Sequence, residues 1–456
     1  MSTPGIVIAA PSSGSGKTTI ATGLIGALRR AGHAVAPFKV GPDFIDPGYH
    51  GLAAGRPGRN LDPVLVGDHL IGPLYRHGSA DADIAVVEGV MGMFDGRISD
   101  APAAGAARGS TAHVAGLLGT PVILVVDARG QSHSVGALVH GFATFDSSVR
   151  LVGVILNRVG SARHEAVLRQ GCEQAGIAVL GAVPRTDELA VPSRHLGLVT
   201  AVEHGGRARS AVDAMADLVA RHVDLAAVVS AARSDVGGDP WTPHIGEPTG
   251  APVTVALAAG RAFTFNYAEH TELLSAAGAD VVTFDPLTDP LPAHTAAVVI
   301  PGGFPEECGP ELSANRAVRE QIAALAHSGA PIQAECAGLT YLADDLDGHP
   351  MCGVIGGSAS FTPSLTLGYR DAVAVADSSL HHLGDRIVGH EFHRTAMHYG
   401  PTRQPAWRYR GRAGAMVDDG VVRGGVHAGY LHTHPAVHPE AIARFVRAAA
   451  HSKLAG

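Results

Sequence analysis

The sequence contains little cysteine and few aromatic residues for its length. Only 4 of its 456 residues are Cys, and Phe, Trp and Tyr together make up 5%. The cysteines show neither a metal-type pairing nor the density of a small disulfide-linked domain, which indicates a reducing compartment. A cytoplasmic location is therefore expected.

The chain also lacks an excess of positive charge and a long apolar run. Its formal net charge is -8, which argues against nucleic acid as the main partner, because phosphate backbones are bound by clustered Lys and Arg. An apolar stretch at 113–126 is interrupted by Gly119-Thr-Pro121 and is too short to cross a bilayer. We expect neither a nucleic-acid partner nor a membrane segment.

Small and apolar residues are abundant instead, with 58 Gly and an apolar fraction of 46%. From residue 5 to about 185, short apolar runs alternate with helix-like segments. This predicts a doubly wound, parallel α/β domain with its functional site at the C-terminal ends of the strands. The predicted strands are 5–10, 34–40, 83–88, 121–127, 151–157 and 179–183.

The chain length predicts two domains. Residues 226–250 are rich in Pro, Gly and Asp, which favours a linker between domains at 1–225 and 251–450. After the linker the α/β alternation restarts. The predicted elements there are strands at 253–258, 280–284, 297–300 and 331–335 and a helix around 269–277.

A glycine-rich loop, Pro11-Ser-Ser-Gly-Ser-Gly-Lys-Thr-Thr19, joins the first strand to a helix. This setting is typical of a phosphate-binding loop, in which backbone N–H groups and a lysine hold phosphates and a hydroxyl reaches Mg²⁺. ATP and Mg²⁺ are thus the predicted cofactors, although Pro11 stands where the motif usually begins with Gly. The predicted nucleotide-binding residues are Ser13, Gly14, Ser15, Gly16, Lys17, Thr18, Thr19 and Asn157. Asn157 either contacts the base or forms a turn.

Acidic residues follow two of the predicted strands. Mg²⁺ bound to nucleotide phosphates needs one or two carboxylates, which predicts Asp43 and Glu88 as ligands beside Thr18. We expect Asp43 and Asp95 to take part in catalysis.

Two further polar residues near these strand ends have open assignments. Lys39 either meets an anionic substrate or lies at a strand end with its charge in water. Asp46 either contacts substrate or caps a helix. Substrate binding is the assignment we carry forward for both.

A second candidate site surrounds Cys336, which follows a predicted strand and precedes Ala337-Gly338. A helix N-terminus after the cysteine is expected to lower its thiol pKa. Gly303 and Ala337 supply candidate N–H groups for an oxyanion hole, and His432 or His434 is a candidate base. The segment Gly389-His-Glu-Phe-His-Arg394 is expected to be structural or to line the substrate site.

The chain resembles the cobyrinate and hydrogenobyrinate a,c-diamide synthases. The resemblance spans nearly the whole length, and its most specific motifs are those at 39–47 and 88–96. The motifs that carry it are 12–19, Lys39-Val-Gly-Pro-Asp-Phe-Ile-Asp-Pro47, Glu88-Gly-Val-Met-Gly-Met-Phe-Asp-Gly96, 301–306, 334–338, 389–393 and Tyr430-Leu-His432.

The resemblance implies a dethiobiotin-synthetase-like P-loop ligase domain followed by a flavodoxin-like class I (triad-type) glutamine amidotransferase domain. Cys336 would attack L-glutamine with His432 as its base. The ammonia released would then amidate a carboxylate of a corrinoid that ATP has phosphorylated. Simpler amidotransferases commonly carry Glu two residues after the histidine, where this chain has His434, so the orienting group stays open. A homodimer is also left open.

Other families share parts of this pattern. Partitioning-type ATPases use a related loop, but with a lysine where this chain has Ser12, and they need no cysteine domain. Cobyric acid synthase has an Asn-containing stretch in place of residues 40–46, and a nickel-sirohydrochlorin diamide synthase has a similar plan. Among a,c-diamide synthases, the overall likeness favours hydrogenobyrinate as substrate, with cobalt-containing cobyrinate as the alternative.

Overall fold

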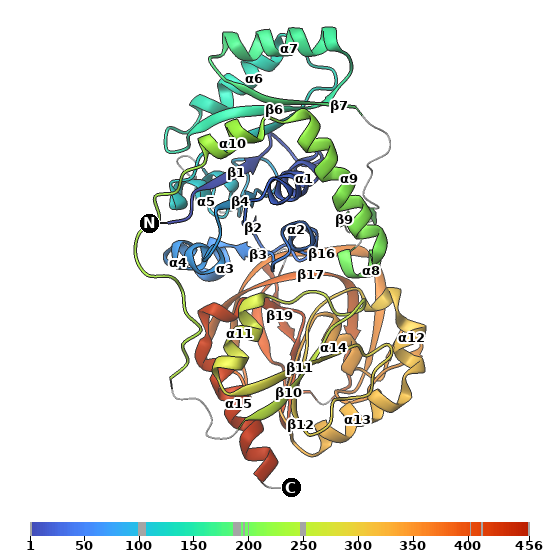
Figure 1. Ribbon diagram of the computed structural model, residues 1–456. Helices are drawn as coiled ribbons and strands as arrows, with labels where there is room; N and C mark the ends of the chain where they lie inside the picture. The colour runs from blue at the N-terminus through green and yellow to red at the C-terminus, as the bar shows by residue number, and fades with distance from the viewer. Residues whose placement is uncertain are drawn as a thin grey trace. The chain divides into compact units, whose positions relative to one another are not determined.

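The computed structural model describes residues 2–98, 106–185, 193–194, 197–198, 200–246, 252–401, 403–411 and 414–454. The chain divides into two compact units, Met1–Thr242 and Pro243–Gly456 (Figure 1). The division falls inside the predicted linker, 226–250. That segment begins in a helix, α10 (Leu225–Ala231), and residues 247–251 lie outside the described part of the chain.

The first unit is built on a seven-stranded parallel sheet in the order β3-β2-β4-β1-β5-β6-β7. Its six longer strands match the predicted apolar runs because both faces of the sheet are covered. The strands are β1 (Gly5–Ala9), β2 (Val35–Val40), β3 (Arg59–Leu61), β4 (Ile84–Glu88), β5 (Val122–Asp127), β6 (Leu151–Val159) and β7 (Val179–Pro184). Strand β3 was not predicted, since three residues carry too short a pattern.

Helices flank this sheet, and α1, α2 and α9 pack against one another. Gly23 allows the close approach of α1 to α9, because a Cβ there would lie 2.5 Å from the Met215 carbonyl oxygen. The helices are α1 (Lys17–Arg30), α2 (Asp46–Ala54), α3 (Pro63–Val66), α4 (Asp68–Gly78), α5 (Thr111–Leu118), α6 (Ser134–Thr144), α7 (Ala162–Gln174), α8 (Ala201–His204) and α9 (Gly206–His222). A short pair, β8 (Ser193–Arg194) and β9 (Gly197–Leu198), completes the described elements.

The second unit contains a six-stranded sheet in the order β11-β10-β12-β13-β21-β20, parallel except at the β20–β21 edge. Its strands are β10 (Val253–Ala258), β11 (Ala279–Phe284), β12 (Thr295–Ile300), β13 (Ile332–Glu335), β20 (Val421–Arg423) and β21 (Val426–Gly429). The helices are α11 (Ala268–Ala276), α12 (Gly309–Ala314), α13 (Arg316–His327), α14 (Ala337–Leu342) and α15 (Pro439–Leu454).

A second sheet of this unit was not predicted. Its main feature is a long antiparallel hairpin, β16 (Ser358–Ala374) with β17 (Arg386–His398), and β17 also pairs with β22 (His432–Thr433). The hairpin mixes buried and exposed positions, so its apolar pattern is weak. The remaining strands are β14 (Asp345–Leu346), β15 (His349–Pro350), β18 (Trp407–Arg410) and β19 (Met416–Asp419).

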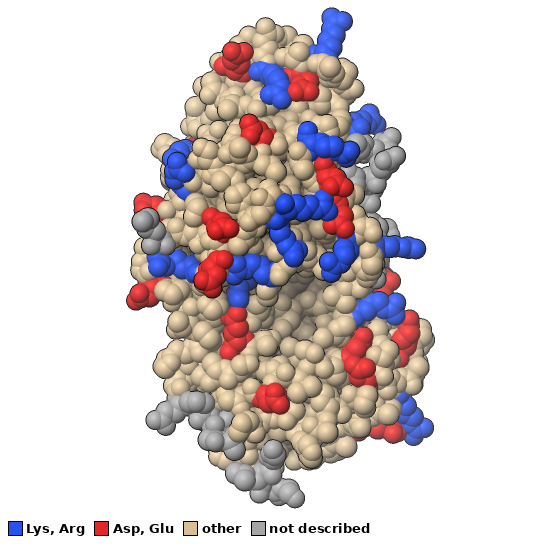
Figure 2. Space-filling view, in the orientation of Figure 1, with Lys and Arg blue, Asp and Glu red and all other residues tan. Residues whose placement is uncertain are grey.

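Acidic and basic side chains are interspersed on the face drawn in Figure 2. None of the helices in the described ranges has the length and apolar character needed to cross a bilayer.

Candidate active site

The glycine-rich loop joins β1 to α1 at the centre of the first sheet. Gly14 and Gly16 adopt positive φ angles of 79° and 90°, a conformation that glycine tolerates without strain. Gly16 is the N-cap of α1, so Lys17, Thr18 and Thr19 form its first turn. Free N–H groups at this helix end suit a phosphate group.

Asn157 and Arg158, at the end of β6, donate hydrogen bonds to the backbone of this loop. Asn157 Nδ2 donates to the Ser15 carbonyl oxygen at 3.0 Å, and Arg158 Nη1 donates to the Gly14 carbonyl oxygen at 2.8 Å. Asn157 Oδ1 accepts the Arg158 N–H at 2.9 Å. Both ends of the Asn157 amide are thus engaged by the chain, and its contact with the base of a nucleotide stays a prediction.

Lys17 points across the loop, and its Nζ donates to the Met91 carbonyl oxygen at 2.7 Å. Burial lowers the pKa of Lys17, and the charge of Glu88 only partly offsets this effect. The sequence contains three lysines, Lys17, Lys39 and Lys453. Every lysine of the first unit therefore lies at this site.

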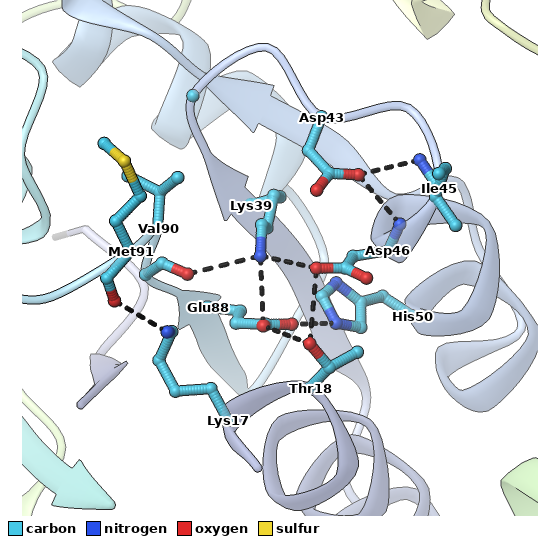
Figure 3. Close-up of polar contacts among 12 residues, drawn as sticks. Lys17, Thr18, Lys39, Asp43, Ile45, Asp46, His50, Glu88, Val90 and Met91 are labelled. Atoms are coloured by element: carbon cyan, nitrogen blue, oxygen red, sulfur yellow. Dashed lines mark hydrogen bonds and ion pairs between the residues drawn. The ribbon is translucent and has the colours of Figure 1, made fainter. Parts of the chain in front are cut away.

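Lys39 joins two carboxylates in the centre of the cluster (Figure 3). Its Nζ lies 2.5 Å from Asp46 Oδ2 and 3.0 Å from Glu88 Oε1. Thr18 Oγ1 donates to Glu88 Oε1 at 2.7 Å and lies 3.3 Å from Asp46 Oδ2. Strands β2 and β4 and helices α1 and α2 thus bring four polar side chains to one point, as the order of the parallel strands requires.

Electrostatic compensation explains how these charges are buried. Burial opposes ionisation of Glu88, but Lys39, His50 and Thr18 hold the pKa of its carboxyl below the usual value. Burial opposes the charge of Lys39 as well, and Asp46 and Glu88 outweigh it and raise its pKa. Lys39 and Glu88 thus favour their charged forms, whereas burial and the charge of Asp43 raise the pKa of Asp46 to about 7.

Asp43 and Asp46 lie at the start of α2 and have different hydrogen-bond partners. Asp43 Oδ1 accepts the N–H groups of Ile45 at 2.7 Å and Asp46 at 3.0 Å, so Asp43 caps the start of α2. Asp46, in the first turn, places its carboxylate beside Thr18 instead. The carboxylate beside Thr18 is thus that of Asp46, while the charge of Asp43 reaches Lys39 and Asp46; the expected metal and catalytic roles of Asp43 stay predictions.

Asp95 is exposed, and its Oδ2 accepts the Gly92 N–H at 2.9 Å. It lies within electrostatic reach of Lys17. The expected role of Asp95 in catalysis stays a prediction.

His50 was missed by the sequence analysis. It lies one helical turn after Asp46 on α2, and its Nε2 is 2.7 Å from Glu88 Oε2. The spacing of four residues from Asp46 places both on one face of the helix, which is the signal that could have identified it.

In the second unit, Cys336 forms a sharp corner between β13 and α14. Its φ of 51° and ψ of -100° are strained for a residue with a side chain. The corner is held by a hydrogen bond of 2.8 Å from the Cys336 N–H to the Gly429 carbonyl oxygen. Such a turn presents a nucleophile at the end of a parallel strand.

The backbone N–H groups of Ala337 and Gly303 lie near the Cys336 sulfur and lower its pKa, and the thiol itself donates to the Phe392 carbonyl oxygen at 3.7 Å. Even so, burial raises the pKa of Cys336, and the charges of Glu306 and Glu335 add to it against those two donors. The expected lowering by the helix end is therefore present but outweighed by burial. Burial thus favours the protonated form of this thiol.

His432 lies in β22 and is closed off from solvent. A Cβ added to Gly302 would lie 2.2 Å from His432 Cε1, so the imidazole packs directly on the turn that carries Gly303. Its Nδ1 is 3.6 Å from Glu335 Oε2. The structure thus brings Cys336, Gly303, Ala337 and His432 together.

Residues of the segment 389–394 take part in a buried polar network of the second unit. Glu391 pairs with Arg370 Nε at 2.5 Å and accepts from the Tyr409 hydroxyl at 2.9 Å. The His393 ring stacks on Tyr430 with a centroid distance of 3.8 Å. Within the described ranges, no group of three or more His, Cys, Asp or Glu side chains is arranged to hold a metal by itself.

Two family models match the chain in succession. Residues 6–199 match the CobQ/CobB/MinD/ParA nucleotide binding domain, and residues 254–439 match the CobB/CobQ-like glutamine amidotransferase domain. The first unit is thus a nucleotide-binding domain and the second an amidotransferase domain.

Curated relatives match this chain over both domains. The hydrogenobyrinate a,c-diamide synthases of Mycobacterium bovis and Mycobacterium tuberculosis are 70% identical over 448 residues, which cover 98% of both chains. This chain belongs to the a,c-diamide synthase family. The cobyrinate a,c-diamide synthase of Syntrophotalea carbinolica is 42% identical, with 98% of each chain covered.

Proposed function

We propose that this protein converts the a and c carboxylates of hydrogenobyrinate to amides, using ATP and ammonia from glutamine. The observation that carries the proposal is the pairing of a lysine- and carboxylate-lined phosphate loop with a strained cysteine that faces two N–H donors. The 70% identical relatives named for this reaction support the choice of substrate.

In the first unit the loop would hold the phosphates of ATP while Lys17 and Lys39 stabilise negative charge. A substrate carboxylate oxygen would attack the γ-phosphorus, ADP would leave, and an acyl phosphate would result. Ammonia would then attack the acyl carbon, phosphate would leave, and the nitrogen would lose a proton. Fixed cations favour the transfer because they need no reorganisation as charge develops.

The residues present suit a magnesium ion bound together with nucleotide. Oxygens of Thr18, Glu88 and Asp46 converge, and Mg²⁺ commonly takes one or two carboxylates and completes its shell with phosphate and water. Bound there, it would neutralise charge on the transferring phosphoryl group. Lys39 Nζ lies between the two carboxylates and supplies positive charge to the same oxygens.

In the second unit the Cys336 sulfur would attack the side-chain amide of glutamine as its proton passes to His432. The N–H groups of Gly303 and Ala337 would stabilise the resulting oxyanion. Ammonia would leave with that proton, and water would hydrolyse the thioester to glutamate.

Cobyrinate is the second candidate substrate, since relatives near 42% identity carry that name. Incubation with each ring, ATP, Mg²⁺ and glutamine, followed by mass spectrometry and NMR, tests the choice. Hydrogenobyrinate should gain two amides, at a and c, faster than cobyrinate. Faster amidation of cobyrinate, or amides at other positions, would overturn the assignment.

We also propose a cytoplasmic location and leave a homodimer open. All four cysteines are free and buried, which fits a reducing compartment. Cell fractionation and gel filtration test these two points.

A further inference from the structure

Glu335 is the last residue of β13 and directly precedes Cys336. Its Oε2 lies 3.6 Å from Nδ1 of His432, whose side chain is fully buried. One strand end thus carries the nucleophile and, beside it, a carboxylate that faces the candidate base.

The other oxygen of this carboxylate is anchored. Glu335 Oε1 accepts from Thr433 Oγ1 at 2.9 Å and lies 3.4 Å from the Thr433 N–H and 3.5 Å from Gln333 Nε2. Donors on two strands therefore fix Oε1 and leave Oε2 directed at the imidazole.

His434 occupies the position where simpler amidotransferases carry an acid, and it is committed elsewhere. Its Nδ1 accepts the Ala436 N–H at 3.3 Å, so it caps the turn at 435–437. Its ring lies 4.3 Å from that of Tyr267.

We propose that Glu335 is the positioning residue that orients His432 and stabilises its protonated form during glutamine hydrolysis. The inference rests on the proposed amidotransferase function. In simpler amidotransferases the orienting carboxylate follows the histidine by two residues, whereas here it directly precedes the cysteine.

The geometry assigns the two ring nitrogens. Because Nδ1 faces Glu335, Nε2 receives the thiol proton as the bond from sulfur to the amide carbon forms. The same proton then passes to the departing nitrogen as the carbon–nitrogen bond breaks. A carboxylate behind the ring favours the imidazolium that exists between these steps.

Other ionisable groups near the pair come from several elements. His390 on β17 is neutral, because burial, His432 and Arg370 lower its pKa to about 3. Cys336, His270 and His427 each experience the charge of Glu335. A pH profile must be compared between variants that leave these groups unchanged.

The test is glutamate release by the full chain carrying Glu335→Gln, which keeps an acceptor for Thr433 and removes the charge. We expect kcat to fall at least about tenfold, within the range known for general acid–base groups, with the KM for glutamine unchanged. The acidic limb of the kcat/KM profile should move to lower pH. Glu320→Gln, which removes an exposed carboxylate on α13, is the matched control and should alter neither.

Unchanged kcat and an unchanged acidic limb in Glu335→Gln would overturn the inference. If that variant no longer binds glutamine, Thr433→Val decides, because it keeps the carboxylate and removes its anchor. A fall of about fivefold or more in kcat supports the inference, and wild-type kcat contradicts it. Amidation from added ammonium, measured in parallel, reports on the proposed synthetase reaction separately.

Discussion

His50 Nε2 lies 2.7 Å from Glu88 Oε2, and neither side chain reaches solvent. The contact occupies one oxygen of Glu88 and leaves the other for Thr18 and Lys39. A residue on α2 thus sets the direction of a carboxylate on β4.

Replacing His50 by Leu should impair the ATP-dependent step. The change leaves a buried carboxylate short of a partner, and breaking such a pair costs about 3–5 kcal/mol. ADP formation in the presence of substrate should fall, while glutamate release measured alone persists. His50→Gln, which retains a donor, should recover part of the activity. Wild-type ADP formation in His50→Leu would show that Glu88 needs no such support.

Asn157→Ala should weaken ATP binding without changing the choice of base. Loss of one hydrogen bond to the loop costs about 1 kcal/mol, or roughly fivefold in affinity. Because the amide supports the loop, affinities for ATP and GTP should fall by the same factor. Calorimetric titration of both nucleotides measures this. A loss of affinity confined to ATP would indicate instead that Asn157 contacts the base.

Gly302→Ala should abolish glutamine hydrolysis selectively. The added methyl would lie 2.2 Å from His432 Cε1, and such overpacking typically costs about 1–3 kcal/mol while moving the base. Gly400→Ala is the matched control, since nothing lies within 4 Å of the added atom. Glutamate release at the wild-type rate in Gly302→Ala would contradict the placement of His432.

The second unit should lose stability in mild acid through buried histidines. Burial lowers the pKa of His427 from 6.5 to about 4, against the opposing charge of Glu335. Below pH 6.5 the unfolded chain therefore binds a proton that the folded chain does not. At about 1.4 kcal/mol per pKa unit, roughly 3 kcal/mol is lost as the pH falls from 6.5 to 4.

Thermal unfolding of the full chain at several pH values measures this loss. His427→Asn should flatten the dependence, whereas replacement of the exposed His451 should leave it intact. An equal slope in His427→Asn would assign the acid sensitivity to other groups.

The sequence predicts the framework better than the details of the sites. Strands β1, β2 and β4 are recognisable because both of their faces are buried. The loop at 11–19 follows from the chemistry of phosphate binding. The pairing of Asp46, rather than Asp43, with Thr18 depends on where α2 begins, and residue spacing does not fix that.

Contacts between distant strands were the hardest to predict. Glu335 meets His432 because the end of β13 lies near β22, which belongs to the other sheet of this unit, and no local pattern encodes that proximity. The hairpin of β16 and β17 was not predicted, because its residues alternate irregularly between buried and exposed. Local pattern singled out Cys336, and the family resemblance favoured His432 over His434, but the contacts that support both residues come from the tertiary fold.

The central claim is that ammonia is released at Cys336 and used at the phosphate loop. The most direct test supplies Cys336→Ala with ATP, Mg²⁺ and hydrogenobyrinate, giving either glutamine or ammonium chloride as nitrogen donor, and counts product amides by mass spectrometry. We predict no amide from glutamine and two amides from ammonium. Amides formed from glutamine, or none from either donor, would contradict the account.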